Sequence, residues 1–202
     1  MSLGALVLAA GESARMGKPK PLLEIAGETF LERILRTLDQ LEGLDLRVAV
    51  LGHHATQVRR AVEFHGAQAI TFRGYRQGML ASIKAGARAA LKYRPDLEAL
   101  ILCFVDQPLV QAETYAALLN AFQPDKDDVV IASYGGEHGH PIVLARPFLD
   151  RLLDETTADS LAGFIEGQQA RRRYLDCDDP AVVQNVNTPE AYEALQQPEE
   201  SS

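Results

Sequence analysis

Apolar residues recur along the chain in six short runs, which alternate with longer segments of mixed polarity. A short and continuous apolar run is typical of a buried strand that is covered on both faces. Each run is followed by a segment that is long enough for a helix or a turn. We therefore expect strands at residues 3–9, 46–51, 67–72, 99–105, 129–132 and 141–145.

Four of the intervening segments have the apolar spacing of an amphipathic helix. The first is the clearest, because Thr29 and Glu32 form a capping-box pattern directly before an apolar stripe. The others cover residues 56–65, 78–92 and 112–122, and Pro147 stands at a favoured first position of a further helix. The residues that we expect to face inward are Leu31, Ile34, Leu35, Leu38 and Leu41 in the first helix, Met79, Ile83, Ala87, Ala90 and Leu91 in the third, and Tyr115, Leu118, Leu119 and Phe122 in the fourth.

The alternation of strand and helix predicts parallel strands, joined by right-handed crossovers, with helices on both faces of the sheet. Gly135-Gly136 indicates a tight turn between 129–134 and 140–145, so this later part should be antiparallel and the sheet mixed. We predict an α/β fold, a Rossmann-like three-layer sandwich with a mostly parallel, mixed central sheet. The length of 202 residues suits one domain, placed at 1–196, and a disordered tail is expected at 197–202.

The formal net charge of -8 argues against a general surface for nucleic acid or for an anionic membrane. The one basic run, 171–173, is interpreted as a solvated strand edge. Cys103 and Cys177 have no metal or redox spacing, and no apolar run approaches the ~20 residues of a membrane span. The first residues lack the pattern of a signal peptide. We expect a soluble cytoplasmic protein with neither nucleic acid nor membrane as a partner.

The segment that follows the first predicted strand combines small residues with three cations. The small residues at 9–11 let a ligand approach the backbone closely. Arg15, Lys18 and Lys20 then supply charge that suits a polyphosphate, although a solvated basic turn is the simpler alternative. The spacing is that of neither a Walker loop, since Pro19 replaces the magnesium-binding hydroxyl, nor a dinucleotide fingerprint.

Asp106 directly follows an apolar strand run, and a carboxylate at a strand end could hold Mg²⁺. Magnesium usually takes one or two protein carboxylates, with phosphate oxygens and water completing its shell. A turn before Pro108 would explain Asp106 equally well. Ligands of α/β sheets bind at the carboxyl ends of the strands, so residues 10–20 and Asp106 should share one crevice.

Two further segments suit the same crevice. Gly78 and Ser82 begin a predicted helix, whose N-terminus can bind an anion or a ribose group. Thr188 and Pro189 fit an N-cap and a first helical position. The segment just before them carries Asn185 and Asn187, which an extended backbone would turn to one face.

Residues 8–23 match the pattern LAAG-x-S-x-RMG-x-x-K-x-LL in full, which resembles the signature of the MobA-like nucleotidyltransferases. This family makes dinucleotide forms of the molybdenum cofactor, and the resemblance extends over residues 3 to 196. Shorter elements follow in the family's order: Gly78-x-x-x-Ser82, Asp106-Gln107-Pro108, Gly139-His140-Pro141 and Asn185-x-Asn187-Thr188-Pro189-Glu190.

The resemblance implies the nucleotide-diphospho-sugar transferase type of fold and transfer of NMP from an NTP to a phosphorylated acceptor, with release of pyrophosphate. Arg15, Lys20 and Asp106 would be catalytic, and Mg²⁺ would be held by Asp106 and Asn187. The acceptor side would include His140, and molybdopterin is the expected acceptor, with a molybdoenzyme or its chaperone as a further partner. The nucleotide-binding residues would be Leu8, Ala9, Ala10, Gly11, Gly78 and Ser82.

The motifs leave the base and the acceptor open. The LAAG stretch with Asp-Gln-Pro and Gly-His-Pro resembles the cytidylyltransferase branch, whereas Asn-x-Asn-Thr-Pro-Glu resembles the guanylyltransferase branch. Phe72 and Arg73 stand where relatives often carry Asn, which weakens inference about the base. We favour CTP narrowly over GTP. A sugar-phosphate or polyol-phosphate nucleotidyltransferase and a non-catalytic nucleotide-binding escort protein remain alternatives.

His138 and His140 form a rival site, because residues i and i+2 of a strand share a face and imidazoles bind Zn²⁺. No third ligand stands nearby in the sequence. Acceptor contact by His140 is therefore favoured over metal binding. His53-His54, after a strand and Gly52, are interpreted as the beginning of a turn.

Overall fold

The computed structural model describes residues 1–196, with the side chain of Arg15 excepted. The tail predicted at 197–202 lies outside these residues. Among the helices of residues 1–196, none has both the length and the apolar character that a membrane crossing requires.

The described residues form a seven-stranded mixed sheet in the order β5-β4-β1-β6-β8-β7-β9. Strand β1 is parallel to both of its neighbours, β4 and β6, whereas β8 is antiparallel to β6 and to β7. Gly135 and Gly136 make the predicted tight turn between β7 and β8, and both have positive φ, as such a turn requires. The strands are β1 Leu3–Ala9, β4 Leu44–Leu51, β5 Gln68–Thr71, β6 Ala99–Phe104, β7 Val129–Tyr134, β8 Glu137–Ala145 and β9 Arg172–Asp176.

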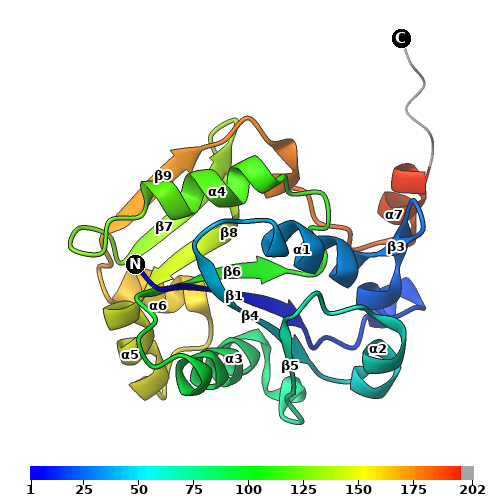
Figure 1. Ribbon diagram of the computed structural model, residues 1–202, viewed down its shortest axis with the longest axis horizontal. Coiled ribbons are helices and arrows are strands. Elements are labelled where there is room, and N and C mark those ends of the chain that lie inside the picture. The colour runs from blue at the N-terminus through cyan, green and yellow to red at the C-terminus, as the bar shows by residue number, and fades with distance from the viewer. Residues whose placement is uncertain (197–202) are drawn as a thin grey trace.

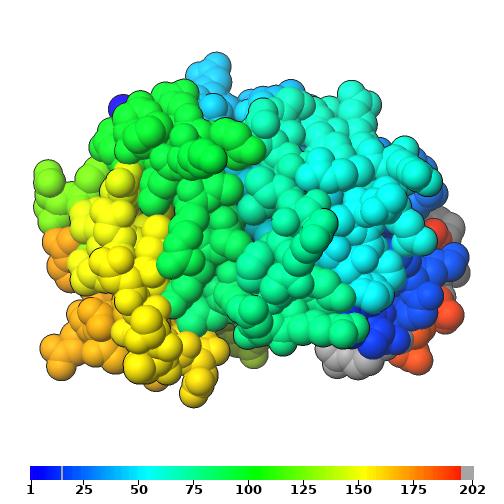
Figure 2. All heavy atoms as spheres, turned by 90° about the horizontal axis from the view of Figure 1, so that it is seen from below, coloured from blue at the N-terminus to red at the C-terminus, as the bar shows by residue number. Residues whose placement is uncertain are grey.

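Helices cover both faces of this sheet, which confirms the predicted three-layer α/β sandwich. Helices α1 and α4 lie on one face and α3, α5 and α6 on the other (Figure 1), and Figure 2 shows the surface that α3 and α5 form. A small hairpin, β2 Glu24–Ile25 and β3 Glu28–Thr29, precedes α1. The helices are α1 Phe30–Asp39, α2 Ala55–Ala61, α3 Met79–Tyr93, α4 Ala112–Ala121, α5 Arg146–Asp154, α6 Leu161–Gly167 and α7 Pro189–Gln196, and the 3₁₀ turns are η1 Ala14–Met16, η2 Lys20–Leu22, η3 Tyr75–Gln77 and η4 Pro180–Val182.

The strongest sequence signals give the expected elements. Thr29 caps α1, with its hydroxyl accepting from the Glu32 N–H at 3.2 Å and the Glu32 carboxylate accepting from the Thr29 N–H at 3.0 Å. The stripe from Leu31 to Leu38 is buried. The helix predicted at 56–65 is wrong at its end, because α2 stops at Ala61 and the chain then turns through left-handed His65 and Gly66.

Met79 was expected to face inward, and this is wrong: it is 56% exposed. It is the first residue of α3, which begins at the left-handed N-cap Gly78. The helix packs on β1 and β4 through its later turns, where Ile83, Ala87 and Ala90 are fully buried. Met79 lines a pocket beyond the strand ends instead of the core.

The basic run 171–173 leads into the edge strand β9, which begins at Arg172, as predicted, but two of its arginines are paired rather than only solvated. Arg171 forms hydrogen bonds with both oxygens of Asp128, at 3.1 and 3.2 Å, and Arg173 Nε lies 3.0 Å from Asp127 Oδ2. The two aspartates are only 7% and 4% exposed. The hydrogen bonds from Arg171 lower the pKa of Asp128 to about 2, despite its burial.

Gly139 of β8 packs against η4 so closely that it has no room for a side chain. A Cβ at this position would lie 2.0 Å from the Val182 carbonyl oxygen, which is backbone and therefore not free to move aside. This contact gives a structural reason for the glycine in the Gly-His-Pro element.

We predict that Gly139→Ala lowers the free energy of unfolding by about 1–3 kcal/mol, as overpacking of a closed interior does. Gly167→Ala is the matched control, because a Cβ there meets nothing within 4 Å. Urea unfolding of both variants measures the difference. Equal stability of the two variants would contradict the close packing of β8 on η4.

Candidate active site

The predicted nucleotide and metal residues line one cavity of about 340 Å³. It lies at the carboxyl ends of β1 and β6, next to the N-terminus of α3, as the rule for ligands of α/β sheets predicts. The side chain of Arg15 is not among those described, and His140 lies outside this lining. The predicted residues that line the cavity are Leu8, Ala9, Ala10, Gly11, Lys20, Gly78, Ser82, Asp106 and Asn187.

Ser13 shapes the loop that carries the cations, a role that the sequence analysis did not assign. It has a left-handed backbone, with φ 55°. Its hydroxyl accepts a hydrogen bond from the Lys20 N–H at 2.9 Å, and its carbonyl accepts from the Met16 N–H at 2.9 Å. The loop therefore closes on itself, and Lys20 begins η2 with its side chain in the cavity.

Lys20, Asp106 and Asn187 converge at one point of this cavity. The Lys20 ammonium lies 3.0 Å from Asp106 Oδ2 and also donates a hydrogen bond to Asn187 Oδ1. The lysine and aspartate side chains are only 15% and 21% exposed. The predicted meeting of cations and Asp106 is thus confirmed for Lys20.

The chain segment before α7 delivers Asn187 to this point. The Val186 N–H donates to the Asp106 carbonyl at 2.8 Å, which ties the segment to the end of β6. The Thr188 hydroxyl accepts from the Ala191 N–H at 3.2 Å, so Thr188 and Pro189 begin α7 as predicted. Asn185 does not accompany Asn187 into the cavity but lines a separate groove beside α7.

The residues at this point fit a divalent cation that is shared with a ligand. Two oxygens, one carboxylate and one amide, already converge on a single positive charge. The described residues contain no group of three His, Cys, Asp or Glu side chains that could hold a metal on their own. Mg²⁺ commonly binds through one carboxylate together with substrate phosphates and water, so Asp106 and Asn187 suit such a shared site.

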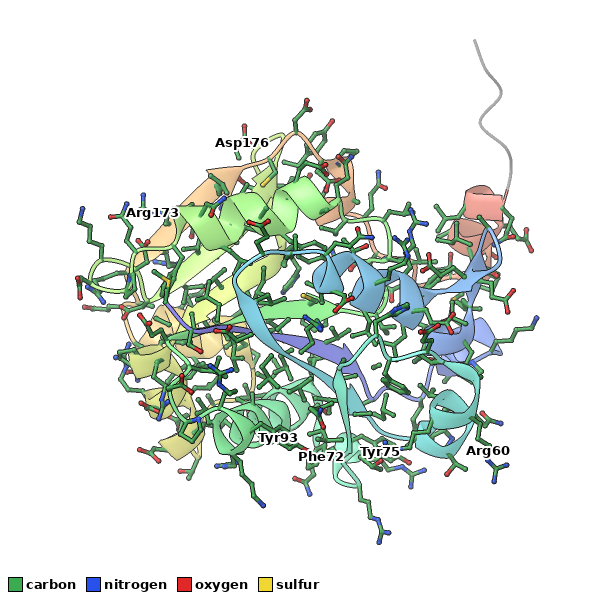
Figure 3. The ribbon with its side chains drawn as sticks, viewed as in Figure 1. Arg60, Phe72, Tyr75, Tyr93, Arg173 and Asp176 are labelled. Carbon is green, nitrogen blue, oxygen red and sulfur yellow. The ribbon has the colours of Figure 1, made fainter. Side chains whose placement is uncertain are left out.

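The loop after β4 packs against the loop after β1 at Ala10, which lines the cavity. Gly52 allows this approach, because a Cβ there would lie 2.2 Å from the Ala10 carbonyl oxygen. The Ala10 carbonyl accepts from the His53 N–H at 3.3 Å. His53 Nδ1 lies 2.9 Å from the hydroxyl of Tyr75, which lines the cavity and lies at the lower right of Figure 3. Sequence reasoning gave neither Gly52 nor Tyr75 a role in the site, because the contacts that place them join distant segments.

His140 borders the cavity through Phe104, whose ring it meets edge-on at 4.3 Å between centroids. Burial lowers the pKa of His140 to about 4, although the nearby Asp106 carboxylate opposes this change. The ring is therefore neutral at neutral pH. His138 stacks at 4.1 Å on Tyr174, so the two histidines of the rival zinc site pack on different rings.

We predict that His140 makes folding stability fall as the pH drops from about 6.5, the unfolded pKa, toward about 4. In this window the unfolded chain binds a proton that the folded protein excludes. His140→Gln should therefore lose less stability between pH 7 and pH 5 than the unmutated protein, as measured by urea unfolding. His138→Gln is the control, and equal losses in the His140→Gln and unmutated proteins would show that His140 is not buried in its neutral form.

Comparison with known proteins supports the chemistry that this geometry suggests. The family model of the MobA-like NTP transferase domain matches residues 5–197. The molybdenum cofactor guanylyltransferase of Shewanella sp. (strain W3-18-1) is 28% identical over 207 residues, which cover 96% of this chain and 95% of that protein. The bifunctional protein GlmU of Xanthomonas campestris pv. campestris (strain 8004) is 29% identical over 149 residues, or 73% of this chain. The chain spans about a third of the length of that relative, 31%.

A solved structure agrees with the fold over nearly the whole chain. The crystal structure of Rv0371c from Mycobacterium tuberculosis H37Rv matches with a TM-score of 0.83 at 26% identity, and the match covers 96% of this chain and 97% of that chain. The fold is that of the nucleotide-diphospho-sugar transferases, as the resemblance implied.

Proposed function

This chain belongs to the MobA-like NTP transferase family and is a nucleotidyltransferase, and from this premise we propose its substrates. It transfers the NMP group of an NTP, with CTP preferred to GTP, to the phosphate of molybdopterin and releases pyrophosphate. The observation that carries this proposal is the convergence of Lys20, Asp106 and Asn187 beside the small-residue loop at 8–11.

The proposed reaction needs charge neutralisation and positioning more than it needs an acid or a base. An oxygen of the acceptor phosphate attacks the α-phosphorus, and the bond to the β-phosphate breaks. A phosphate monoester has its second pKa near ~6, so the acceptor is mostly dianionic at neutral pH and requires no general base. Lys20 and Arg15, with the loop amides, bind the triphosphate, and Lys20 offsets the charge that builds up on the leaving pyrophosphate.

The residues that would hold Mg²⁺ are Asp106 and Asn187. A bound Mg²⁺ would supply Lewis-acid polarisation of the α-phosphate at these two residues. Ser82, which is 5% exposed, and the N-terminus of α3 at Gly78 would bind the nucleoside end of the substrate.

The aromatic side chain beside Asp106 favours an acceptor that contains a planar ring system. Phe104 lines the cavity next to Asp106, and the neutral His140 ring meets the Phe104 ring edge-on. A planar ring system can stack on an aromatic side chain of this kind. This favours molybdopterin over a sugar phosphate or a polyol phosphate.

Pyrophosphate release tests the proposal. The protein is mixed with Mg²⁺, one NTP and either molybdopterin, a sugar phosphate or a polyol phosphate. Release with molybdopterin alone is the expected result. Release with only a sugar phosphate or polyol phosphate would overturn the acceptor, and nucleotide binding without release under every condition would favour a non-catalytic escort protein.

We predict that Asp106→Ala abolishes turnover at every Mg²⁺ concentration, whereas Asn187→Ala raises the Mg²⁺ concentration needed for half-maximal rate by about tenfold. The carboxylate is the stronger of the two ligands, so its loss is not compensated. Asn187→Asp should lower the Mg²⁺ requirement. The rate is followed by pyrophosphate release as Mg²⁺ is varied.

Two matched controls separate ligation from general damage. Asp154→Ala removes an exposed aspartate at the end of α5, and Asn185→Ala removes the amide that lies outside the cavity. Both should retain the Mg²⁺ dependence of the unmutated protein. If Asn187→Ala also retains it, the second metal ligand lies elsewhere.

We predict that Ala10→Gly improves the use of GTP relative to CTP. Ala10 is 5% exposed, and Gly52 and His53 hold its backbone, so its methyl group has a fixed position in the cavity wall. Removing this methyl group leaves more room for a purine. The ratio of kcat/KM values for the two nucleotides measures the change, and an unmutated protein that already prefers GTP would overturn the assignment to CTP, in agreement with the Shewanella relative.

A further inference from the structure

The cation position between Asp106 and Asn187 is occupied by the protein's own ammonium group. Lys20 Nζ lies 3.0 Å from Asp106 Oδ2 and donates to Asn187 Oδ1, the same two oxygens that would bind a metal. The aliphatic stem of Lys20 is anchored at its base, because the Lys20 N–H is bonded to the Ser13 hydroxyl. The ammonium group is therefore held at this position by contacts at both ends of the residue.

A metal ion and this ammonium group exclude one another. Mg²⁺ binds oxygen at about 2.0–2.1 Å, so an ion bridging the two oxygens would lie within van der Waals distance of Nζ. Two positive charges in a partly buried site also repel strongly. The Lys20 ammonium must leave before a metal can bind Asp106 and Asn187 together.

We infer that Lys20 holds the metal position until a triphosphate binds, so that a divalent cation enters this site with the nucleotide and not before it. The inference rests on the proposed function in one respect, which is that the ligand that draws Lys20 away from Asp106 and Asn187 is a triphosphate. A triphosphate offers the ammonium group new anionic partners a short distance from its first position. Lys20 thereby acts as a positioning residue for metal entry as well as a phosphate ligand.

This arrangement couples two binding events through one side chain. The metal loses affinity in the free protein because it must displace an ion pair, and it regains that affinity when the lysine is bound to phosphate. Such coupling is a difference in affinity between two states of Lys20. It has a specific consequence, since removal of the ammonium group should increase metal binding even though it decreases turnover.

The test is Mn²⁺ binding to the nucleotide-free protein, measured by the electron paramagnetic resonance signal of free Mn²⁺. Lys20→Met should bind Mn²⁺ about tenfold more tightly than the unmutated protein, a change of about 1.4 kcal/mol. Lys20→Arg keeps a cation on a stem of similar length and should show no gain. Thermal unfolding of each variant confirms that it is folded.

Lys18→Met controls for loss of charge alone. Lys18 is exposed two residues away, and it takes part in none of the ion pairs found within residues 1–196. An equal gain in Lys18→Met and Lys20→Met would overturn the inference, because general electrostatics would then explain both. Adding Asp106→Asn to Lys20→Met should remove the gain, which would locate it at this site.

The unmutated protein provides a test that does not depend on the fold of any Lys20 variant. Its Mn²⁺ binding without nucleotide should be weak and should not change in Asp106→Asn. Tight binding that is lost in Asp106→Asn would overturn the inference. These results are independent of pyrophosphate release, so a failure of the proposed reaction and a failure of the Lys20 mechanism are distinguished.

Discussion

The parallel pairing of β1 with β6 is the contact on which the site depends. Leu8 pairs with Phe104, and just beyond them the Val105 N–H donates to the Leu8 carbonyl at 3.1 Å. The two strands therefore end side by side, and the loops that follow them lie in the same space. The loop after β1 carries Lys20, and the loop after β6 places Asp106 next to it. The segment with Asn187 is bonded to the loop after β6 through the Asp106 carbonyl.

Close backbone contacts keep these loops in place with few side chains. Ser13 closes the cation loop by bonding to the Lys20 N–H, and Gly52 brings the end of β4 against Ala10. Gly139 does the same for β8 against η4. The loops of the site are thus held mainly by backbone contacts. In the proposed mechanism, the Lys20 side chain is the group that changes its partners, from Asp106 and Asn187 to the triphosphate.

Sequence reasoning predicted the fold class and brought together most of the cavity residues, because both depend on strong and general rules. Apolar runs define strands, and ligands bind at the carboxyl ends of parallel strands, so the meeting of Lys20 with Asp106 followed from order alone. Asn187 was identified through a family motif rather than through its surroundings. The helix caps at Thr29 and Thr188 were also predictable, since capping is local.

The features that sequence reasoning missed depend on contacts between distant segments. The exposure of Met79 depends on where α3 begins relative to the sheet edge, and periodicity carries no such information. The contact between Gly52 and Ala10 joins two loops that are about forty residues apart. Asn185 and Asn187 lie two residues apart, as do residues on one face of a strand. In the structure, however, Asn187 lines the cavity and Asn185 lines a separate groove.

The pairing of Arg171 and Arg173 with two nearly buried aspartates has a consequence for the open edge of the sheet. A slip of β9 by one residue would turn Arg173 to the opposite face, away from the nearly buried Asp127. The arginines therefore fix the register of a strand that has a neighbour on only one side. Any chain that added to the outer side of β9 would meet a strand of fixed register that carries Arg172 and Arg173, and charged residues on an edge strand disfavour edge-to-edge aggregation.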